Sequence, residues 1–325
     1  IMREREARTE PTRAVPEVVG SGPFRFVKEE HRQGYRIVYE RNAQYRPRAE
    51  PPSYLSGGKK VNIDRVEWMA MPDPGTAVAA LQRGELDICS SPPLDLLPVL
   101  RGRRDIVIAS TNPQGWVAYV RPNFLHAPFD KPEARRALQL AIRQADVVAA
   151  VGADAEWGVR ECFSFLACGG ANESEAGTDA IRRGDLAEAR RLLQSIGYDG
   201  TPVVFIAPGD NEPLRIISTV AAEQMRAAGF VVDLQFSDFA AMMARRNRRE
   251  VPSQGGWNMF PMLAFAFELD SPASNFLLGT ACDGTGYAGW ACDQALFDTR
   301  QSWLREPDPA RRQQLVQQMQ IEAAQ

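Results

Sequence analysis

The residues best suited to holding a small molecule lie in one short segment, Gln254-Gly255-Gly256-Trp257-Asn258-Met259-Phe260-Pro261. The indole of Trp257 offers a flat apolar surface, and the amide of Asn258 beside it offers hydrogen-bond donors and an acceptor. Two preceding glycines allow close approach of the backbone. This combination suits an extended ligand in a site shielded from water, with Met259 and Phe260 as neighbouring contacts. The alternative is that Trp257 packs between a helix and a sheet.

A second group of candidates lies between residues 116 and 123. Trp116 and Tyr119 would supply aromatic walls, while Arg121 and Asn123 would supply a guanidinium and an amide for a ligand carboxylate. Capping of the following Pro-Phe turn is the competing role for the last two residues. The sequence therefore predicts ligand contact for all four residues and leaves the structural alternative open.

Catalytic and metal-binding chemistry is not indicated. His31 and His126 lie in a hairpin tip and a loop with no partnering Ser, Cys or acidic constellation nearby in the sequence, and no nucleophile-elbow string is present. Asp270 and Asp283 are isolated, and no glycine-rich segment has the residues of a nucleotide site. We therefore expect neither an enzyme nor a bound cofactor or metal.

The five cysteines fall into two local pairs and one single residue. Cys162 and Cys168 are six residues apart, Cys282 and Cys292 are ten apart, and Cys89 stands alone. Local pairs in loops suit disulfides in an oxidising compartment. The alternative is a four-cysteine zinc site, which normally needs two to four residues between paired ligands. Two disulfides and a buried free thiol at Cys89 are the favoured prediction.

Composition narrows the class of protein. The chain has 325 residues with a formal net charge of −3, so the basic stripe of a nucleic-acid binder is not expected. The arginines of 245–249 are interpreted as a solvated helix end. No apolar run reaches the ~18 residues of a membrane span, and no signal peptide is visible. The charged start and the helical end suggest an internal piece of a longer protein.

The elements that would position these residues follow from periodicity and turn chemistry. Alternating apolar residues predict a hairpin with strands around Phe24 and Tyr39, then a strand over 61–70. A short helix closed by Gly84 is expected to lead into another strand at 85–88, which would complete a βαβ-type unit. Further on, the pattern predicts the following elements: a strand from 116, one helix over 134–145, a capped helix from Asp185, a strand over 202–207, a helix over 213–228, a strand over 230–236 and a last helix from Pro309. The strands at 202–207 and 230–236 should be parallel neighbours.

Four segments carry a resemblance to a known family: the hairpin of 21–47, the turn and helix of 72–88, the strand, Pro128-Phe129 turn and Arg135-Arg136-Ala137-Leu138 helix of 116–150, and the Gly-Trp segment of 254–261. In this order they resemble the family 5 extracellular solute-binding proteins, the peptide, nickel and oligosaccharide receptors of bacterial ABC importers. The resemblance extends from Val19 to about Gln320.

The resemblance implies an α/β fold, a bilobal periplasmic-binding-protein-like type II architecture. Residues 1–18 would form a lead-in, 19–109 part of lobe I, and 110–325 most of lobe II, with the rest of lobe I and a return strand absent. The family's Gly-Trp strand end lines the cleft. Peptide-binding members often carry an acidic residue three positions after that Trp, for a peptide α-amino group. Phe260 occupies this position here, and Asp270 is the candidate replacement.

The function that the resemblance implies is capture of a small solute, most simply an oligopeptide or a peptide-like compound, in an interlobe cleft. A periplasmic monomer would deliver it to an ABC permease of the inner membrane, without a cofactor and without contact with nucleic acid. A chemoreceptor module of the same fold is the first alternative. A peptide hydrolase is a weaker one, because the sequence shows no nucleophile paired with a base.

Overall fold

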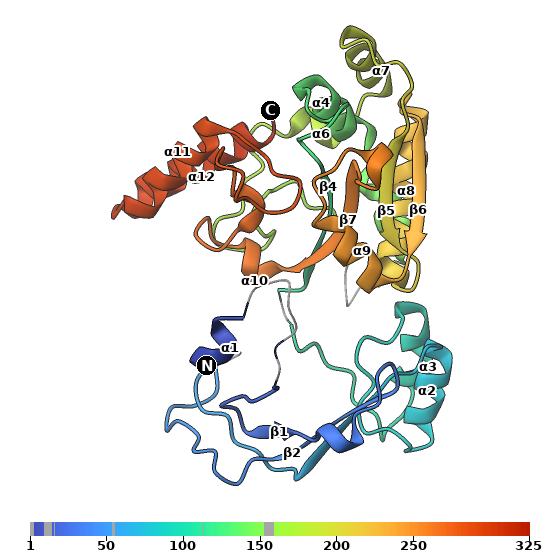
Figure 1. Cartoon of the computed structure of the whole chain (residues 1–325), viewed down its shortest axis with the longest axis vertical. Helices are drawn as coiled ribbons and strands as arrows, with labels where there is room; N and C mark the ends of the chain where they lie inside the picture. Colours follow the sequence, from blue (N-terminus) through green and yellow to red (C-terminus); the bar gives the residue numbers. More distant parts are fainter. Residues whose placement is uncertain (1–2, 10–14, 16, 54–55, 113, 153–158) are drawn as a thin grey trace. The chain divides into compact units, whose positions relative to one another are not determined.

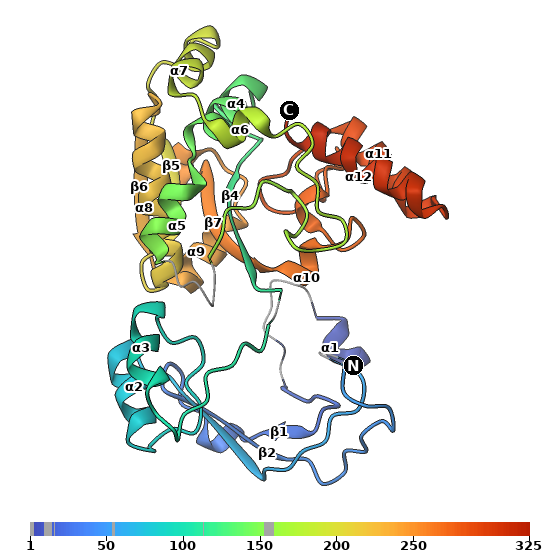
Figure 2. The ribbon, with the colours of Figure 1, turned by 180° about the vertical axis from the view of Figure 1, so that it is seen from behind.

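The computed structural model describes residues 3–9, 15, 17–53, 56–112, 114–152 and 159–325. The chain divides into two compact units, Ile1–Ile108 and Ala109–Gln325, which we call unit 1 and unit 2. Figures 1 and 2 show the elements of each unit from opposite sides.

Unit 1 is built on a three-stranded antiparallel sheet in the order β1-β2-β3. Ile37 of β2 lies opposite Trp68 of β3, and Phe26 of β1 lies opposite Tyr39 of β2. The predicted hairpin is therefore present. The elements of unit 1 are α1 (Glu4–Ala7), β1 (Phe24–Phe26), the 3₁₀ helix η1 (Lys28–Glu30), β2 (Arg36–Arg41), β3 (Arg65–Met69), α2 (Pro74–Gln82), the 3₁₀ helix η2 (Leu94–Leu96) and α3 (Leu97–Arg101).

Helix α2 begins and ends where local chemistry requires. The carboxylate of Asp73 accepts a hydrogen bond from the amide of Thr76 at 2.6 Å, which makes it the N-cap. Gly84 follows the helix with a φ of +74°, a conformation that glycine adopts without steric cost.

The strand predicted over 85–88 is absent, so the prediction of a βαβ-type unit is wrong. These residues form no ladder with the three strands described for unit 1, and the side chain of Ile88 is 80% exposed. An extended segment needs a neighbouring edge to become a strand, and sequence alternation alone does not supply one. Cys89 has a free thiol but is half-buried rather than buried.

Unit 2 contains a four-stranded mixed sheet in the order β4-β7-β5-β6. β5 and β6 are parallel neighbours, as predicted, and β7 runs antiparallel to β4. All six residues of β5 are buried, which fits its apolar sequence and its interior place in the sheet. The strands are β4 (Trp116–Pro122), β5 (Val203–Pro208), β6 (Val232–Ser237) and β7 (Met259–Phe265).

Two apolar cores cover the two faces of this sheet. Alternate residues of β5 point to opposite sides, so Phe205 packs with residues of α4, α7 and α8, while Val204 and Ile206 pack with Met242 of α9. The helices are α4 (Pro132–Ala141), α5 (Gln144–Val151), α6 (Asp179–Arg183), α7 (Leu186–Ser195), α8 (Glu212–Ala227), α9 (Phe239–Arg246), α10 (Ala266–Leu269), α11 (Gln294–Arg305) and α12 (Pro309–Ala323), with 3₁₀ helices η3 (Pro252–Gln254) and η4 (Phe276–Leu278).

The helix predicted as continuous over 134–145 is two helices. The backbone becomes extended at Ile142 and Arg143, between α4 and α5. The side chain of Gln224 in α8 bonds both the amide and the carbonyl of Arg143, each at 3.2 Å. A contact distant in sequence thus satisfies the polar backbone groups where the helix is interrupted. Within the described part of the chain, no helix is both long and apolar enough to cross a membrane.

Candidate functional site

Trp257 lies in the interior of unit 2, immediately before β7. Its side chain is fully buried, and its indole Nε1 donates to the carbonyl of Arg246 at 3.1 Å. Phe260 packs edge-on against the ring at 5.1 Å between centroids, and Trp290 lies 5.8 Å away. The geometry favours the packing alternative for Trp257.

Asn258 and Asn123 are also buried, and their amides join strand ends. The Asn258 side chain accepts from the Val204 amide at 2.8 Å and donates to the Ala127 carbonyl at 2.8 Å. The Asn123 side chain donates to the Trp257 carbonyl at 3.0 Å. It also accepts from the Leu125 amide at 3.0 Å. Because these amides already have buried partners, their role in this structure is to fix the ends of β4, β5 and β7.

Met259 and Phe260 belong to the cores on opposite faces of the sheet, and neither is exposed. Residues 257–260 therefore lie inside unit 2, and this burial argues against direct ligand contact. The expected close approach at the glycines is present: a Cβ on Gly256 would lie 1.8 Å from the Glu250 carbonyl oxygen. The sequence left this alternative open for Trp257, because an indole next to an amide can line a ligand site or pack in a core.

The arginine run of 245–249 is only partly a solvated helix end. Arg245 donates to the carbonyls of Gly255 at 3.0 Å and Gly256 at 2.8 Å, and so holds the loop before Trp257. Arg246 is half-buried and points into the core over the ring of Phe260. The other arginines of the run, Arg248 and Arg249, are exposed.

Trp116 remains accessible and belongs to a row of stacked rings. Its side chain is 54% exposed and stacks on Phe265 with centroids 3.8 Å apart. Phe265 stacks in turn on Phe267 at 5.1 Å. We call these three residues the aromatic ladder. The register explains it, because Trp116 opens β4 directly opposite Phe265 at the end of β7.

Asp270 directly follows α10 and has an unusual environment. Its Oδ1 is buried and has no hydrogen-bond partner among the described residues, whereas its backbone carbonyl accepts from the Asn172 side chain at 2.9 Å. A Cβ on Gly170 would lie 1.7 Å from this oxygen, so a larger residue there would force the Asp270 side chain to move. A carboxylate oxygen held in this way is suited to a cationic partner, because burying an unpaired charge is costly.

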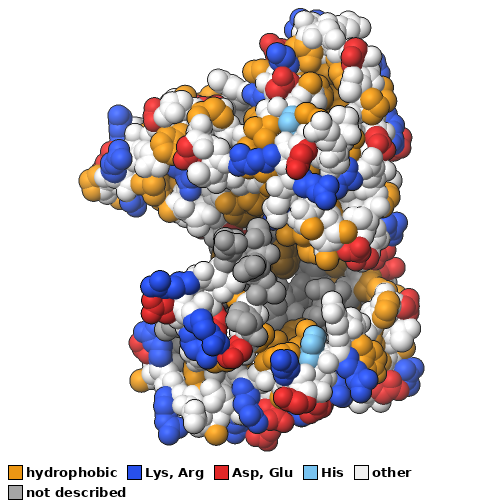
Figure 3. All heavy atoms as spheres, viewed as in Figure 1, with side chains coloured by type: hydrophobic (Ala, Val, Ile, Leu, Met, Phe, Trp, Pro, Cys, Tyr) orange, Lys and Arg blue, Asp and Glu red, His pale blue; other side chains and the backbone are white. Residues whose placement is uncertain are grey.

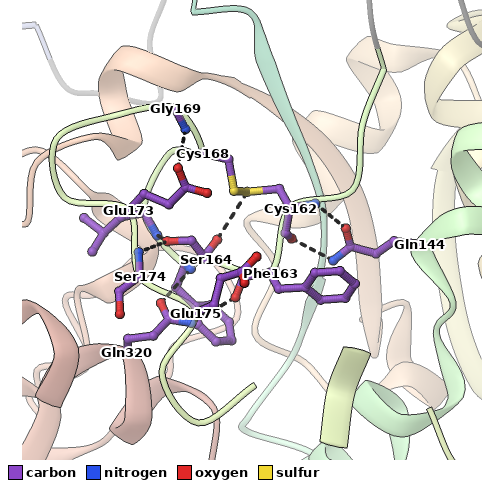
Figure 4. The surroundings of a disulfide bond; sticks show 12 residues. Gln144, Cys162, Phe163, Ser164, Cys168, Gly169, Glu173, Ser174, Glu175 and Gln320 are labelled. Carbon is purple, nitrogen blue, oxygen red and sulfur yellow. Dashed lines mark hydrogen bonds between the residues drawn. A yellow bond between two sulfur atoms is a disulfide. The ribbon is translucent and has the colours of Figure 1, made fainter. Parts of the chain in front are cut away.

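The four paired cysteines form disulfides in the structure, Cys162 with Cys168 and Cys282 with Cys292. Figure 4 shows how the first loop is held from two helices. Gln144 bonds the amide and the carbonyl of Cys162 at 2.7 and 2.8 Å, and Gln320 of α12 bonds the Phe165 amide at 2.9 Å. Gly170, two residues after Cys168, lies against the side chain of Asp270. The second disulfide closes the loop that carries Tyr287 and Trp290.

Tyr119 and Arg121 lie on the face of β4 opposite to Trp116. The Tyr119 hydroxyl is 2.8 Å from the Tyr287 hydroxyl, which accepts from Arg246 Nη1 at 2.9 Å. Arg121 is buried, and its Nη1 donates a hydrogen bond to the Leu277 carbonyl at 3.4 Å. We call Tyr119, Arg121, Arg246 and Tyr287 the arginine–tyrosine cluster. Neither Arg246 nor Tyr287 was among the residues that sequence patterns indicated.

Neither histidine is arranged for catalysis in the described structure. A ring nitrogen of His126 lies 2.8 Å from the Arg249 carbonyl, and one of His31 lies 3.2 Å from the Arg36 carbonyl. Among residues whose placement is described, no three His, Cys, Asp or Glu side chains are grouped to hold a metal ion. On the face seen in Figure 3, basic and acidic side chains are interspersed over each unit.

The model of the bacterial extracellular solute-binding proteins, family 5 middle, matches residues 4–286. A probable peptide ABC transporter periplasmic-binding protein, y4tO of Sinorhizobium fredii, is 32% identical over 98% of this chain. The aligned region is 60% of that relative, so the chain spans about three fifths of its length.

Two solved structures are similar in fold. The periplasmic binding protein DppA of Helicobacter pylori, in complex with the peptide STSA, has a TM-score of 0.73 and 19% identity over 94% of this chain and 56% of its own. The dipeptide binding protein of Pseudoalteromonas sp. SM9913, in complex with Met-Leu, has a TM-score of 0.71 and 19% identity over 93% of this chain and 57% of its own. At 19% identity, these two comparisons show a similar fold and nothing further.

Proposed function

The chain belongs to family 5 of the bacterial extracellular solute-binding proteins, and from this premise we propose that it is the solute-capturing component of an ABC importer. Unit 1 is then part of lobe I and unit 2 most of lobe II. The protein acts in the periplasm as a monomer and delivers its solute to an inner-membrane permease. It catalyses no reaction and uses no cofactor, and its solute is a peptide-like compound, as the names of its relatives suggest.

The observation that carries this proposal is the exposed aromatic ladder. An isolated exposed tryptophan is ordinary, but three stacked rings with the outer one half exposed form a preorganised apolar wall. Aromatic walls of this kind hold apolar side chains or the flat peptide groups of a ligand. Trp116, rather than Trp257, is therefore the tryptophan that we assign to the solute.

Asp270 adds a polar group for the same solute. It lies three residues after Phe267 of the aromatic ladder, and its buried Oδ1 is free of described partners. A ligand ammonium group is the natural partner for this oxygen, because a charge-assisted hydrogen bond would satisfy it. We assign Asp270 to the solute's amino group.

The first experiment is native mass spectrometry of the full-length protein as purified, before and after unfolding and refolding. A removable mass of a few hundred daltons, released on unfolding, is the expected result, and its fragmentation identifies the solute. A bound mass without amino-acid fragments would contradict a peptide-like solute. Turnover of the released compound by the protein would contradict the absence of catalysis.

The variant Trp116→Ala tests the site itself. We expect it to weaken binding of the identified solute by roughly tenfold or more, because a stacking surface is lost. Trp68→Ala is the matched control, since Trp68 is 57% exposed, close to the 54% of Trp116, and lies in unit 1. Equal affinities of the two variants for the solute would contradict the assignment of the aromatic ladder to the binding site.

A further inference from the structure

The loop of residues 162–173, which we call the anchor loop, is built onto the segment that ends in Asp270. The amide of Ala167 donates to the Leu269 carbonyl at 3.4 Å, and its buried side chain packs with Leu269 in one apolar cluster. Further along the loop, the side chain of Asn172 donates to the Asp270 carbonyl at 2.9 Å. The anchor loop therefore holds the backbone of residues 269 and 270 at two points.

The Asp270 carboxylate itself lies against the backbone of the anchor loop at Gly170. A Cβ on Gly170 would lie 1.7 Å from Asp270 Oδ1 and 2.8 Å from its Cγ. Gly170 is part of a turn, because its amide donates to the Ala167 carbonyl at 3.1 Å. Oδ1 is buried without a hydrogen-bond partner among the described residues, and a carboxylate free to rotate would turn such an oxygen toward water. The position of the carboxylate therefore depends on the anchor loop.

Side chains of two helices and one disulfide hold the anchor loop in place (Figure 4). Gln144 of α5 bonds the backbone of Cys162 on both sides, and Gln320 of α12 donates to the Phe163 carbonyl at 3.0 Å. These two glutamines fix the start of the loop. The bond between Cys162 and Cys168 then joins this fixed start to the part of the loop beside the carboxylate.

The anchor loop is also linked to the segment that follows Asp270. The buried side chain of Asn275 donates to the Phe165 carbonyl at 2.9 Å and to the Leu269 carbonyl at 3.1 Å. Its oxygen accepts from the amides of Leu277 at 3.0 Å and Leu278 at 3.3 Å. Opening the loop should therefore also loosen residues 275–278.

We propose that the anchor loop is the positioning element for the Asp270 carboxylate, and that the Cys162–Cys168 disulfide thereby sets the preference of the protein for solutes with a free ammonium group. This role rests on the proposed function, in which Asp270 meets the amino group of the solute. A carboxylate that is already in place loses little conformational freedom on binding, so its charge-assisted hydrogen bond contributes more to affinity. Asp270 contacts the solute, whereas the anchor loop acts through it.

The first test needs no solute. Hydrogen–deuterium exchange of the full-length protein is compared between the wild type and the double variant Cys162→Ser/Cys168→Ser. We expect the amides of residues 275–278 to exchange about tenfold faster or more in the variant, and those of β5, residues 203–208, to exchange as in the wild type. Unchanged exchange at 275–278, or an equal increase in β5, would overturn the positioning role.

The second test measures the preference for an ammonium group. Binding of the dipeptide Met-Leu and of its des-amino analogue, 4-(methylthio)butanoyl-leucine, is measured by calorimetry. We expect the wild type to bind Met-Leu about tenfold more tightly or better, and the double variant to lose most of this ratio. Gly170→Ala should lose it too, with the disulfide intact, because the new Cβ displaces the carboxylate. Misfolding of one variant leaves the other as the test, and a general structural defect would weaken both ligands alike.

Two matched controls should keep the ratio of the two affinities. Cys282→Ser/Cys292→Ser removes the other disulfide of unit 2, whose loop has no hydrogen bond to Asp270 in the described structure. Gly209→Ala places a Cβ in ordinary contact at 3.6 Å.

The outcomes separate the positioning role from the proposed function. A ratio kept by both anchor-loop variants would overturn the positioning role and leave Asp270 in the site. Equal binding of the two ligands by the wild type would refute the assignment of Asp270 to an amino group, and with it the preference that the disulfide sets. If neither ligand binds, the peptide part of the proposed function is refuted, and the exchange comparison still decides whether the anchor loop holds the segment around Asp270.

Discussion

The side-chain oxygen of Asn258 accepts a hydrogen bond from the amide of Val204 at 2.8 Å, although the two residues are 54 positions apart. The backbone amide of Asn258 returns a bond to the Val204 carbonyl, also at 2.8 Å. This exchange joins the start of β7 to β5, where the ladder between the two strands has just one registered pair, Phe205 with Met259. The side-chain amide of Asn258 therefore adds a hydrogen bond where β5 and β7 share only one backbone pair among the described residues.

We expect Asn258→Ala to lower the free energy of unfolding by roughly 2–4 kcal/mol, since it leaves the Val204 amide and the Ala127 carbonyl buried without side-chain partners. Denaturant unfolding of the full-length protein measures this change. Asn247→Ala, at an exposed position after α9, is the control and should change stability little. A loss below about 0.5 kcal/mol for Asn258→Ala would contradict a structural role.

Gly256→Ala should destabilise unit 2 by roughly 1–3 kcal/mol or more, because the new Cβ would meet the Glu250 carbonyl oxygen at 1.8 Å and the backbone must shift. Gly209→Ala is the comparison in the same unit, since a Cβ there makes an ordinary contact at 3.6 Å. Thermal unfolding of the two variants should separate them clearly. Equal Tm values would show that the backbone of residues 250–256 can shift without loss of stability.

Loss of the Cys282–Cys292 disulfide should destabilise the protein by about 2–3 kcal/mol, the chain-entropy value for a loop of this length. The double variant Cys282→Ser/Cys292→Ser is compared with Cys89→Ser, which changes a free thiol. Urea unfolding reports the stability of both.

Stability should fall at acid pH partly through Glu30. Both its carboxylate oxygens accept from Arg65, at 2.6 and 3.0 Å, and these bonds hold its pKa below the ordinary value. A carboxyl group with a lowered folded pKa stabilises the fold above its unfolded pKa, about 4.3, and loses that contribution as pH falls through the folded value. Unfolding measured from pH 6 to pH 3 should therefore change less steeply for Glu30→Gln. Glu29→Gln, next to it and without an ion pair in the described structure, should follow the wild type.

Much of the fold was predictable because its signals are local. Asp73 and Asp185 begin α2 and α7 through bonds to backbone amides three residues away, and Gly84 and Gly229 follow helices with positive φ. The pairing of β5 with β6 also followed, since a strand, a helix and a strand in succession have few ways to pack. The family resemblance rested on these same ordered segments.

The candidate site was less predictable because accessibility is not local. Trp116 and Trp257 are equally apolar in the sequence, yet one is 54% exposed and the other is fully buried. Arg121 was chosen for its chemistry, but its side chain is buried and donates to the Leu277 carbonyl, 156 positions away. No spacing rule connects residues 119, 121, 246 and 287.

The sequence by itself determined the first hairpin, the capped helices α2 and α7, the parallel pair β5 and β6, and the family, since periodicity and capping act over a few residues. Tertiary structure alone decided that 85–88 finds no strand partner, that Gln224 interrupts a helix at Arg143, and which of two tryptophans reaches solvent. Each of these outcomes depends on hydrogen bonds and burial supplied by residues distant in the chain, and such contacts exist only once the chain is folded.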